Sequence, residues 1–290
     1  MQTHLPSDAV LTDALGTVHA VASTTPRIVC LVPSITELLC DLGLAPYMVG
    51  RTGFCIHPAS VVAAIPKVGG TKDVNSEKIR QLAPTHLIVN VDENEKPTVQ
   101  LLAASIPHVI VTHPLSPHDN LALYRLLGAI FQVSAAAEQL CGRLEEELAQ
   151  LPAPTSFSRV LYCIWQDPWM TVSSQTYISH MLALAGWQTW SPPERTERYP
   201  VFSWDSTPLQ QIEMVMLSTE PYRFTEAHAD ALEKQLGKPV CLLDGEMISW
   251  YGSRAIAGIR YLRELQHQFP HHSDGACTHA QTYTQTYTQT

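Results

Sequence analysis

The sequence is short of charge, and of positive charge in particular. Charged residues make up 16% of its 290 residues, and 27 Asp and Glu outnumber 18 Lys and Arg, which gives a formal net charge of -9. Sequence-independent binding of nucleic acid depends on Lys and Arg that neutralise phosphates, and anionic membranes attract polybasic segments. We therefore expect neither nucleic acid nor an anionic membrane surface as a partner.

Long apolar runs are missing as well. No run approaches the ~20 residues that cross a bilayer, so membrane insertion is not expected. The first 26 residues carry no basic stretch, and Asp8 and Asp13 interrupt any apolar core of a secretory signal. These absences predict a cytoplasmic location, or a periplasmic one if the native N-terminus has been trimmed.

Paired cysteines and enzyme signatures are also absent. The seven cysteines include no C-x-x-C spacing, and their odd number argues against a disulfide framework. No G-x-S-x-G, H-E-x-x-H, phosphate-binding loop or G-x-G-x-x-G occurs. The sequence therefore predicts a protein that is not an enzyme.

What the chain does contain is an alternation of short β-rich and helical segments. The run "RIVCLVP" (27–33) is typical of a buried strand, and Ser34 with Glu37 forms a capping-box pattern at the start of a helix. The same order recurs around "THLIVNV" and "HVIVTH", and again after residue 153. Strands that alternate with short helices predict parallel sheets with helices on their faces.

A longer helical pattern separates the two halves. Apolar residues recur at helical spacing over residues 116–152, with Gly128 and Ser134 as points where the helix could divide. The sequence thus predicts an α/β fold of two Rossmann-like lobes joined by one long rigid helix. The expected parts are an N-terminal leader (1–26), an N-terminal lobe (27–115), a linker helix (116–152), a C-terminal lobe (153–270) and a disordered polar tail (271–290).

Three stretches resemble a known family. "RIVCLVPSITELLCDLGL" and "KVGGTKDVNSEKIRQLAPTHLIV" are similar to the N-terminal signatures of class III substrate-binding proteins, and "SSQTYISHMLALAGW" resembles a helix of their second lobe. The resemblance extends over residues 27–268. Members of this family, the helical-backbone metal receptors among them, bind vitamin B12 or iron–siderophores. The resemblance implies two α/β lobes with a ligand cleft between them, lined by the loops that follow the strands.

The same resemblance implies how such a protein meets an ABC transporter. Exported members dock through one surface glutamate in each lobe. Glu77 in "NSEKI" matches the first glutamate, but Thr207 and Pro208 stand where the second is expected. Exported members also carry a signal peptide or a lipoprotein cysteine, which this sequence does not show. These departures argue against docking on a transporter, while the ligand cleft could be retained.

Two N-lobe loops expected at the cleft hold candidate ligand-binding residues. Pro33 and Ser34 lie at a strand end and helix start, where free backbone N–H groups are available. The loop "RTGFCIHP" holds Phe54, Cys55 and His57. Imidazole and thiolate both ligate transition metals, and residues two apart share one face of an extended segment. His57 and Cys55 are thus the predicted metal ligands; a loop histidine beside a buried cysteine is the plainer interpretation.

The remaining candidates belong to the C-terminal half. Large aromatic rings at strand ends suit flat, mostly apolar ligands such as corrins or porphyrins, although rings also fill cores. The resemblance implies a second-lobe aromatic and an aromatic pair before the last helix, and an arginine there could meet a carboxylate, phosphate or amide group. These candidates are Trp165, Trp169, Trp204, Trp250, Tyr251 and Arg254.

Together these features predict a binding protein for a metal-containing ligand, with a corrinoid (cobalamin) as first choice. Haem or another metal-tetrapyrrole, an iron–siderophore and a bare transition metal ion stay open. The alternative from the enzyme class is a metal–tetrapyrrole chelatase, with His57 as metal ligand and Glu37 or Asp92 as proton acceptor. A third interpretation is a protein-interaction module that has kept the fold and lost the ligand site.

Overall fold

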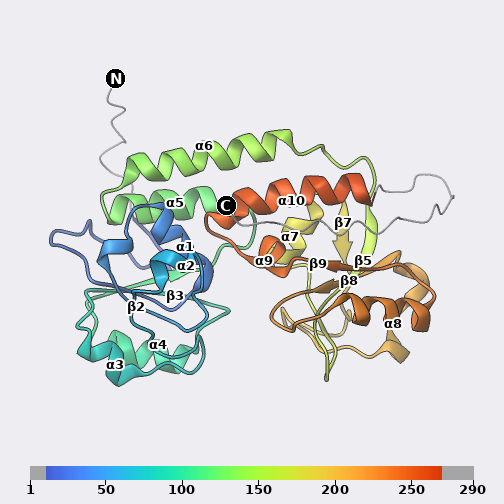
Figure 1. The fold of residues 1–290 in the computed structure, drawn as a ribbon, viewed down its shortest axis with the longest axis horizontal. Coiled ribbons are helices and arrows are strands. Elements are labelled where there is room, and N and C mark those ends of the chain that lie inside the picture. Colours follow the sequence, from blue (N-terminus) through green and yellow to red (C-terminus); the bar gives the residue numbers. More distant parts are fainter. Residues whose placement is uncertain (1–10, 270–290) are drawn as a thin grey trace.

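Two α/β lobes lie side by side under a layer of helices that runs along both of them (Figure 1). The computed structural model describes residues 11–269, so the expected disordered tail (271–290) and the start of the expected leader lie outside the described part. Each lobe is built on a largely parallel sheet. The two-lobe α/β fold predicted from the sequence is therefore confirmed.

The N-terminal lobe has a parallel sheet in the order β2-β1-β3-β4. The strands are β1 (Ile28–Cys30), β2 (Met48–Arg51), β3 (His86–Asn90) and β4 (His108–Thr112). The helices are α1 (Pro33–Asp41), the 3-10 turn η1 (Ala45–Tyr47), α2 (Ala59–Val62), α3 (Ser76–Gln81) and α4 (Lys96–Ala103).

The C-terminal lobe is centred on β5 (Ser158–Trp165), which pairs in parallel with β7 (Trp187–Thr189) on one side and with β8 (Met214–Ser218) on the other. The sheet is completed by β9 (Val240–Leu243), parallel to β8, and by β6 (Met170–Thr171), antiparallel to β5. The helices are α7 (Tyr177–Ala183), η2 (Trp204–Ser206), η3 (Leu209–Gln211), α8 (Glu226–Leu236), α9 (Gly245–Ser249) and α10 (Arg254–Gln268).

Strand β1 shows why the N-terminal run forms a central strand. Its side chains alternate between two apolar layers, because successive residues of a strand point to opposite faces of the sheet. Ile28 and Cys30 join the core on the side of the long helices, whereas Val29 and Leu31 join a separate core on the opposite face of the sheet. All four are fully buried, as expected for a parallel sheet covered on both faces.

The single helix expected over residues 116–152 is instead two helices, α5 (Asp119–Ile130) and α6 (Ser134–Gln150). Helix α5 ends in a Schellman motif. Gln132 adopts a left-handed conformation with φ 59°, the Val133 amide donates to the Gly128 carbonyl at 2.7 Å, and the Gln132 amide donates to Ala129 at 3.3 Å. The chain therefore reverses between the two helices and does not continue as one rod.

Gly128 explains why the reversal is so tight. A Cβ at this position would lie 2.5 Å from the Cβ of Ala137 on α6, so the two helices approach closely only because Gly128 has no side chain. Sequence periodicity could not reveal this break, because apolar residues on both helices face the same core and keep the helical spacing.

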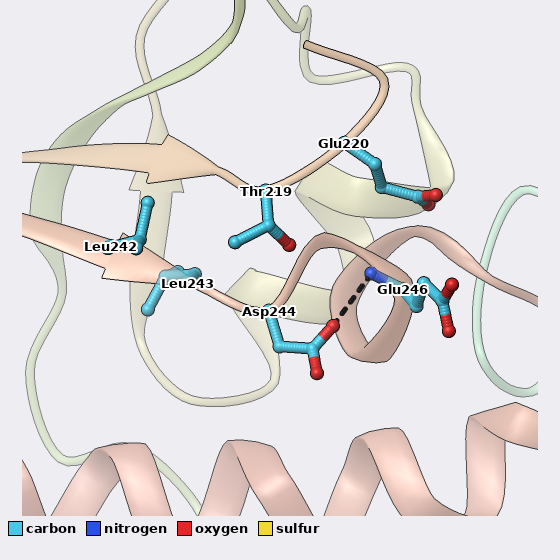
Figure 2. A pocket seen from close by; sticks show the side chains of 6 residues that line it. All are labelled: Thr219, Glu220, Leu242, Leu243, Asp244 and Glu246. Carbon is cyan, nitrogen blue, oxygen red and sulfur yellow. Dashed lines mark hydrogen bonds between the residues drawn. The ribbon is translucent and has the colours of Figure 1, made fainter. Parts of the chain in front are cut away.

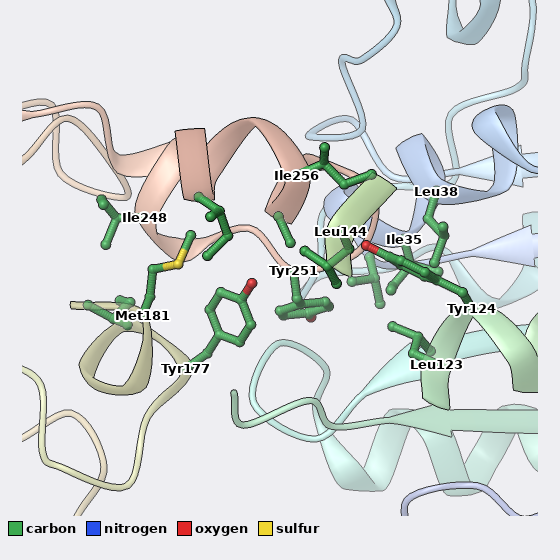
Figure 3. Packing of buried hydrophobic residues seen from close by; sticks show 14 of the residues in the cluster. Ile35, Leu38, Leu123, Tyr124, Leu144, Tyr177, Met181, Ile248, Tyr251 and Ile256 are labelled. Carbon is green, nitrogen blue, oxygen red and sulfur yellow. The ribbon is translucent and has the colours of Figure 1, made fainter. Parts of the chain in front are cut away.

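One apolar core runs from lobe to lobe beneath these helices. Figure 3 shows Tyr124 and Ile35 on the N-lobe side, Tyr177 and Met181 on the C-lobe side, and Tyr251 between them. The Tyr124 hydroxyl also donates to the Gly252 carbonyl at 2.7 Å. This continuous packing fixes the two lobes on the helical side of the molecule.

The segment that precedes β1 is packed against the N lobe where the structure describes it. The Asp13 carboxylate accepts a hydrogen bond from the Val111 amide of β4 at 3.0 Å and lies 3.1 Å from the His19 imidazole. Burial acts to raise the pKa of Asp13, but the contact with His19 and the hydrogen bonds accepted from the Val111, Thr17 and Leu15 amides outweigh it and lower this pKa. Among residues 11–269, no helix combines the length and apolarity that a membrane span requires.

Candidate ligand-binding site

The loops at the carboxyl ends of the strands from both lobes meet between the lobes. Ligands of parallel α/β folds usually bind at such strand ends. The segment after β9, residues 244–254, belongs to the C lobe but contacts both lobes, since Tyr251 reaches Glu93 and Arg254 reaches Glu37. We call the region around these contacts the inter-lobe site.

Arg254 is the centre of a first polar bridge between the lobes, which we call the Arg254 bridge. Its guanidinium donates to both oxygens of Glu37 at 2.8 Å, in a bidentate pair, and lies 3.0 Å from Oε2 of Glu246. The same group lies 4.8 Å from the ring centroid of Trp250. A planar guanidinium suits this combination of a carboxylate fork and an aromatic face. Arg254, predicted to meet a ligand, is thus already engaged by protein carboxylates.

His57 extends the Arg254 bridge on the N-lobe side. Its Nε2 lies 3.0 Å from Oε2 of Glu246, and its ring meets the Trp250 ring edge-on at 5.6 Å. The side chain keeps 34% of its surface exposed, so a ligand can reach it. The acid beside His57 is therefore Glu246, and not Glu37 or Asp92 as the chelatase interpretation requires.

Cys55 does not share this position. Its thiol is fully buried in the N lobe, 3.1 Å from the hydroxyls of both Thr36 and Thr52. Burial raises the pKa of the Cys55 thiol, which keeps it protonated. The expected pairing of Cys55 with His57 as metal ligands is wrong, because the loop turns between them and sends the two side chains apart.

Within residues 11–269, no group of three or more His, Cys, Asp and Glu side chains is arranged to hold a metal ion. A bare metal ion usually needs several protein ligands. An axial bond to a metal that a macrocycle already holds needs only one. Of the predicted metal ligands, His57 is partly exposed and Cys55 is buried.

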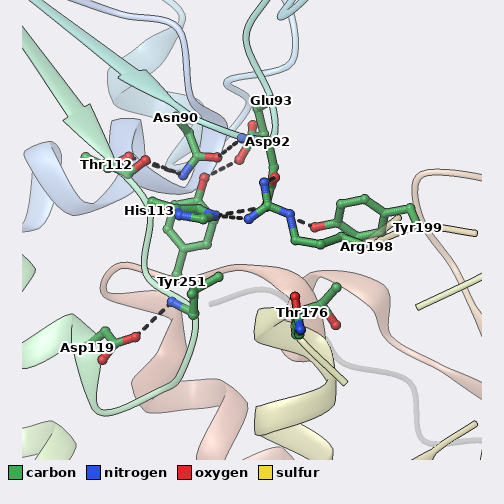
Figure 4. Close-up of polar contacts among 12 residues, drawn as sticks. Asn90, Asp92, Glu93, Thr112, His113, Asp119, Thr176, Arg198, Tyr199 and Tyr251 are labelled. Atoms are coloured by element: carbon green, nitrogen blue, oxygen red, sulfur yellow. Dashed lines mark hydrogen bonds and ion pairs between the residues drawn. The ribbon is translucent and has the colours of Figure 1, made fainter. Parts of the chain in front are cut away.

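Asp92 is the centre of a second polar bridge, which we call the Asp92 bridge (Figure 4). From the C lobe, Arg198 forms an ion pair with its carboxylate and the Tyr199 hydroxyl lies 3.3 Å from it. From the N lobe, Nε2 of His113 lies 3.4 Å from Oδ2 and also contacts the Arg198 guanidinium. Next to this group, the Tyr251 hydroxyl donates to the Glu93 carboxylate.

Asparagines hold the loop that carries Asp92 and Glu93. The Asn90 side chain accepts from the Asp92 amide at 2.8 Å, and the Asn94 side chain accepts from the Asn90 amide at 2.9 Å. Asn94 also donates to the Thr71 carbonyl at 2.9 Å. These side chains replace the backbone partners that the loop lacks, so the two carboxylates are held in place.

Two carboxyls of the inter-lobe site have raised pKa values. Burial is the main cause in each case, because it disfavours the charged form. It raises the pKa of Glu93 to about 7, with the nearby charges of Glu220 and Asp92 acting in the same direction. The pKa of Glu220 is also raised by burial, and Ser249 donates to this carboxylate at 2.7 Å.

A cavity of about 360 Å³ lies at the ends of β8 and β9 (Figure 2). It is lined by Thr219, Glu220, Leu242, Leu243, Asp244 and Glu246. The Asp244 side chain caps α9 by accepting from the Glu246 amide at 3.0 Å. The lining is acidic, and Glu246 connects the cavity to the Arg254 bridge.

The predicted aromatic residues are divided between the site and the C-lobe core. Trp169 and Trp204 pack edge-on at 5.1 Å, and Trp169 stacks on Phe224 at 5.8 Å. Both tryptophans are partly buried and pack against the C-lobe core that includes residues of β5 and β8. Trp165 has 39% of its surface exposed and meets Tyr222 edge-on.

The other three predicted aromatic residues differ in their exposure. Phe54, in the loop after β2, is 63% exposed. Trp250 and Tyr251 are buried between the lobes, where both take part in the polar bridges. The aromatic pair thus lies at the inter-lobe site, as the family resemblance implied, but its rings are covered.

The capping box expected at Ser34 is wrong. Helix α1 begins at Pro33, its N-cap is Val32, and no side chain caps it. Glu37 instead pairs with Arg254, so tertiary contact decides its role. Ser34 is buried, and Gly252 lies so close that a Cβ there would be 2.9 Å from the Ser34 carbonyl oxygen.

The predicted docking residue lies on the molecular surface. The Glu77 side chain is 67% exposed in the first turn of α3, 3.1 Å from Arg80. Thr207, which stands where a second glutamate was expected, is buried and donates to the Ser203 carbonyl at 2.7 Å.

Several residues of the site were not predicted from the sequence. His113 and Glu246 follow strands, and this position was a usable signal. Arg198 and Tyr199 lie in the irregular segment between β7 and η2, where no periodicity marks a side chain. Backbone hydrogen bonds from β6 and the residues after it hold that segment: the Thr171 amide donates to the Pro200 carbonyl at 3.0 Å, and the Ser173 amide donates to the Arg198 carbonyl at 2.8 Å.

Comparison with known proteins agrees with this architecture. Residues 28–235 match the family model described as periplasmic binding protein. The periplasmic haem-binding protein RhuT from Roseiflexus sp. RS-1 superposes with a TM-score of 0.70 at 21% identity, over 83% of this chain and 97% of that one. A search of curated protein sequences gave no significant match.

Two proteins from Vibrio cholerae superpose similarly. The vitamin B12-binding protein BtuF has a TM-score of 0.68 at 19% identity, over 84% of this chain and 98% of its own. The haem-binding protein HutB has a TM-score of 0.66 at 22% identity, over 83% and 99%. The matched family and these relatives are periplasmic, which contradicts the cytoplasmic location expected from the sequence.

Proposed function

We propose that this chain, which belongs to the periplasmic binding protein family, binds a corrinoid between its two lobes. Family membership makes it a substrate-binding protein and not an enzyme. The relatives named above bind haem or vitamin B12, which supports a metal-containing tetrapyrrole as the class of ligand. The choice of a corrinoid within that class rests on the charge of the inter-lobe site.

The excess of carboxylates at this site is the observation that carries the proposal. Arg198 and Arg254 are already paired with the carboxylates of the two bridges. The carboxyls that contact the bridges or line the cavity are Glu37, Asp92, Glu93, Glu220, Asp244 and Glu246. Haem would bring carboxylate side chains into this acidic region, where like charges repel and desolvation costs free energy. A corrinoid presents amides, which donate to carboxylates and accept from tyrosine hydroxyls.

The placement of His57 fits a ligand with a central metal. Its imidazole is partly exposed and lies beside an aromatic ring, and neutral imidazole is a common ligand of cobalt and iron. Its Nε2 is hydrogen-bonded to Glu246, so axial ligation through this atom requires that contact to break. Exposed rings of Phe54 and Trp165 offer apolar surface for a flat macrocycle.

Binding requires the inter-lobe site to open. The cavity of about 360 Å³ falls near the lower limit of pockets for drug-sized ligands, and a corrinoid is considerably larger. The Arg254 and Asp92 bridges occupy the intervening space. We propose that the ligand displaces polar contacts of the Arg254 bridge, while the Asp92–Arg198 ion pair and the apolar core on the helical side stay intact.

A visible-absorbance titration with aquocobalamin, run in parallel with haemin, tests the proposal. We expect a saturable spectral shift with aquocobalamin, and loss of the axial-ligation signature in His57→Ala. The matched control is His267→Ala, an exposed histidine at the end of α10, which should bind like the wild type. No shift with either chromophore would contradict the proposal; a shift that His57→Ala retains would remove the axial role alone.

For docking on a transporter, we propose a contact residue on the N lobe only. The exposed position of Glu77 suits a docking residue of the N lobe. The buried Thr207 offers no equivalent carboxylate on the C lobe. We therefore assign Glu77 as the candidate contact and do not propose docking through a matched pair of glutamates.

A further inference from the structure

Arg198 is the less restrained of the two arginines in the bridges. The Arg254 guanidinium is held by two carboxylates and a tryptophan face, and its side chain is 12% exposed. The Arg198 side chain is 29% exposed. Within residues 11–269, its guanidinium pairs with one carboxylate, that of Asp92. An anionic group on a ligand that entered between the lobes would therefore reach Arg198 more readily than Arg254.

Asp92 is fixed so that it competes with such a group. Its loop is pinned by Asn90 and Asn94, and Tyr199 and His113 contact the same carboxylate. A ligand carboxylate would have to displace the Asp92 carboxylate from Arg198. Asp92 is held in the same protein, so it competes at a high effective concentration. The exchange would leave Asp92 without its arginine, next to the Glu93 carboxyl. A neutral amide imposes no such exchange, because it can bind while the ion pair persists.

We propose that Asp92 is a specificity-determining residue, which occupies Arg198 and so makes the site discriminate against ligands that carry carboxylate side chains. This inference rests on the proposed function, since it assumes that a tetrapyrrole binds between the lobes. Selectivity of this kind arises from a penalty on the wrong ligand, as well as from contacts with the right one. Asp92 penalises a ligand carboxylate because that group must displace it from Arg198. For this role Asp92 does not have to contact the preferred ligand.

The test compares the wild type with Asp92→Asn, in which the side chain keeps its shape and loses its charge. The probes are haemin and haemin dimethyl ester, which share metal and macrocycle and differ in the free carboxylates, with aquocobalamin as the third. We expect Asp92→Asn to bind haemin about tenfold more tightly, as a new charge-assisted contact with Arg198 allows. Affinity for the dimethyl ester and for aquocobalamin should change by less than about threefold.

Two further variants separate the role of Asp92 from a general change of charge. Glu233→Gln removes one negative charge from the exposed face of α8, far from the bridges, and should leave all three affinities unchanged. Arg198→Gln in the wild-type background should not raise haemin affinity, because Asp92 already occupies the arginine and is left unpaired without it. Added to Asp92→Asn, it should abolish the gain for haemin.

The outcomes distinguish this inference from the proposed function. Wild type that binds neither haemin nor aquocobalamin would overturn the proposed function itself. Wild type that binds aquocobalamin, together with an Asp92→Asn variant that gains nothing for haemin or gains equally for its dimethyl ester, would overturn only the role of Asp92. If Asp92→Asn failed to fold, Asp92→Ser would replace it, because it also removes the carboxylate and frees Arg198; no gain for haemin, or an equal gain for its dimethyl ester, would then refute the inference.

Discussion

The two lobes meet through two regions of opposite chemistry. On the helical side, Tyr124, Leu144, Tyr177 and Ile256 pack in one apolar core that belongs to both lobes. On the side of the strand ends, the Arg254 and Asp92 bridges connect the lobes through ion pairs and hydrogen bonds. Tyr251 belongs to both regions, with its ring in the core and its hydroxyl on Glu93.

The two regions differ in whether water or a ligand can replace their contacts. Packed apolar side chains stabilise the folded state because they exclude water. A polar ligand cannot replace these contacts. Ion pairs and hydrogen bonds in a partly exposed region contribute little net stability, because water or a ligand can replace each partner. We infer that the core holds the lobes in place and that the Arg254 bridge is the part that ligand binding rearranges.

Truncation of the core should have the largest effect. Leu144 on α6 is fully buried, so Leu144→Ala should lower the free energy of unfolding by about 3–5 kcal/mol through lost burial and a cavity. Urea titration measures the change, and Leu101→Ala, at a 55% exposed position of α4, is the matched control. A loss below about 1 kcal/mol would mean that this core does not hold the lobes together.

Loss of the Arg254 guanidinium should cost less. Arg254→Gln leaves Glu37 and Glu246 without their shared cation in a partly buried region, and we expect about 1–2 kcal/mol of destabilisation. Arg195→Gln, which removes an exposed surface arginine of the C lobe, is the control and should be neutral. If Arg254→Gln destabilised the protein as much as Leu144→Ala, the distinction between the two regions would fail.

The pKa of Glu93 predicts a pH dependence that the apolar core lacks. This pKa is raised from 4.5 to about 7 in the folded protein, so between these pH values the folded state binds more protons than the unfolded one. The free energy of unfolding should therefore decrease as pH rises from about 4.5 to 7, by about 1–2 kcal/mol relative to Glu93→Gln. The measurement is urea unfolding of both proteins at pH 5 and pH 8.

The neighbouring Glu95 provides the control for this dependence. Glu95→Gln changes an exposed carboxyl next in the same loop and should keep the wild-type pH profile. An equal pH profile in wild type and Glu93→Gln would show that Glu93 does not hold a proton in the inter-lobe site.

Substitution of Glu77 should have the smallest effect on the protein itself. The side chain is 67% exposed and makes only local contacts on α3, so Glu77→Gln should change stability by less than about 0.5 kcal/mol. Aquocobalamin affinity should not change. A lower rate of uptake in cells that depend on this protein would support the docking role, whereas a change in ligand affinity would contradict the assignment of Glu77 to the outer surface.

Much of the fold could be predicted from the sequence. The run "RIVCLVP" and its later counterparts are apolar enough to be buried on both faces, and the alternation with helices predicts a parallel sheet in each lobe. The division at Gly128 and Ser134 was visible as a possibility. Whether the helix breaks there depends on the contact of Gly128 with Ala137, which periodicity does not encode.

The candidate site was predictable in its location and less so in its contacts. His57 lies at the inter-lobe site as expected, whereas Cys55 two residues away is buried among threonines. A local spacing rule assumes an extended segment, and the turn after Gly53 does not satisfy it. Glu37, which pairs with Arg254, and Arg198, which pairs with Asp92, each come from the other lobe, more than 100 residues away in the sequence.

By itself, the sequence determined the elements, their alternation, the two lobes and the loops at which a ligand would bind. These properties follow from hydrophobic periodicity and local turn chemistry, which act over a few residues. Only the tertiary structure decided that Arg198 is held by Asp92, that Glu246 accompanies His57, and that Glu93 lies where burial raises its pKa. Charge pairing and desolvation depend on distances between distant segments, and those distances exist only after the lobes have packed together.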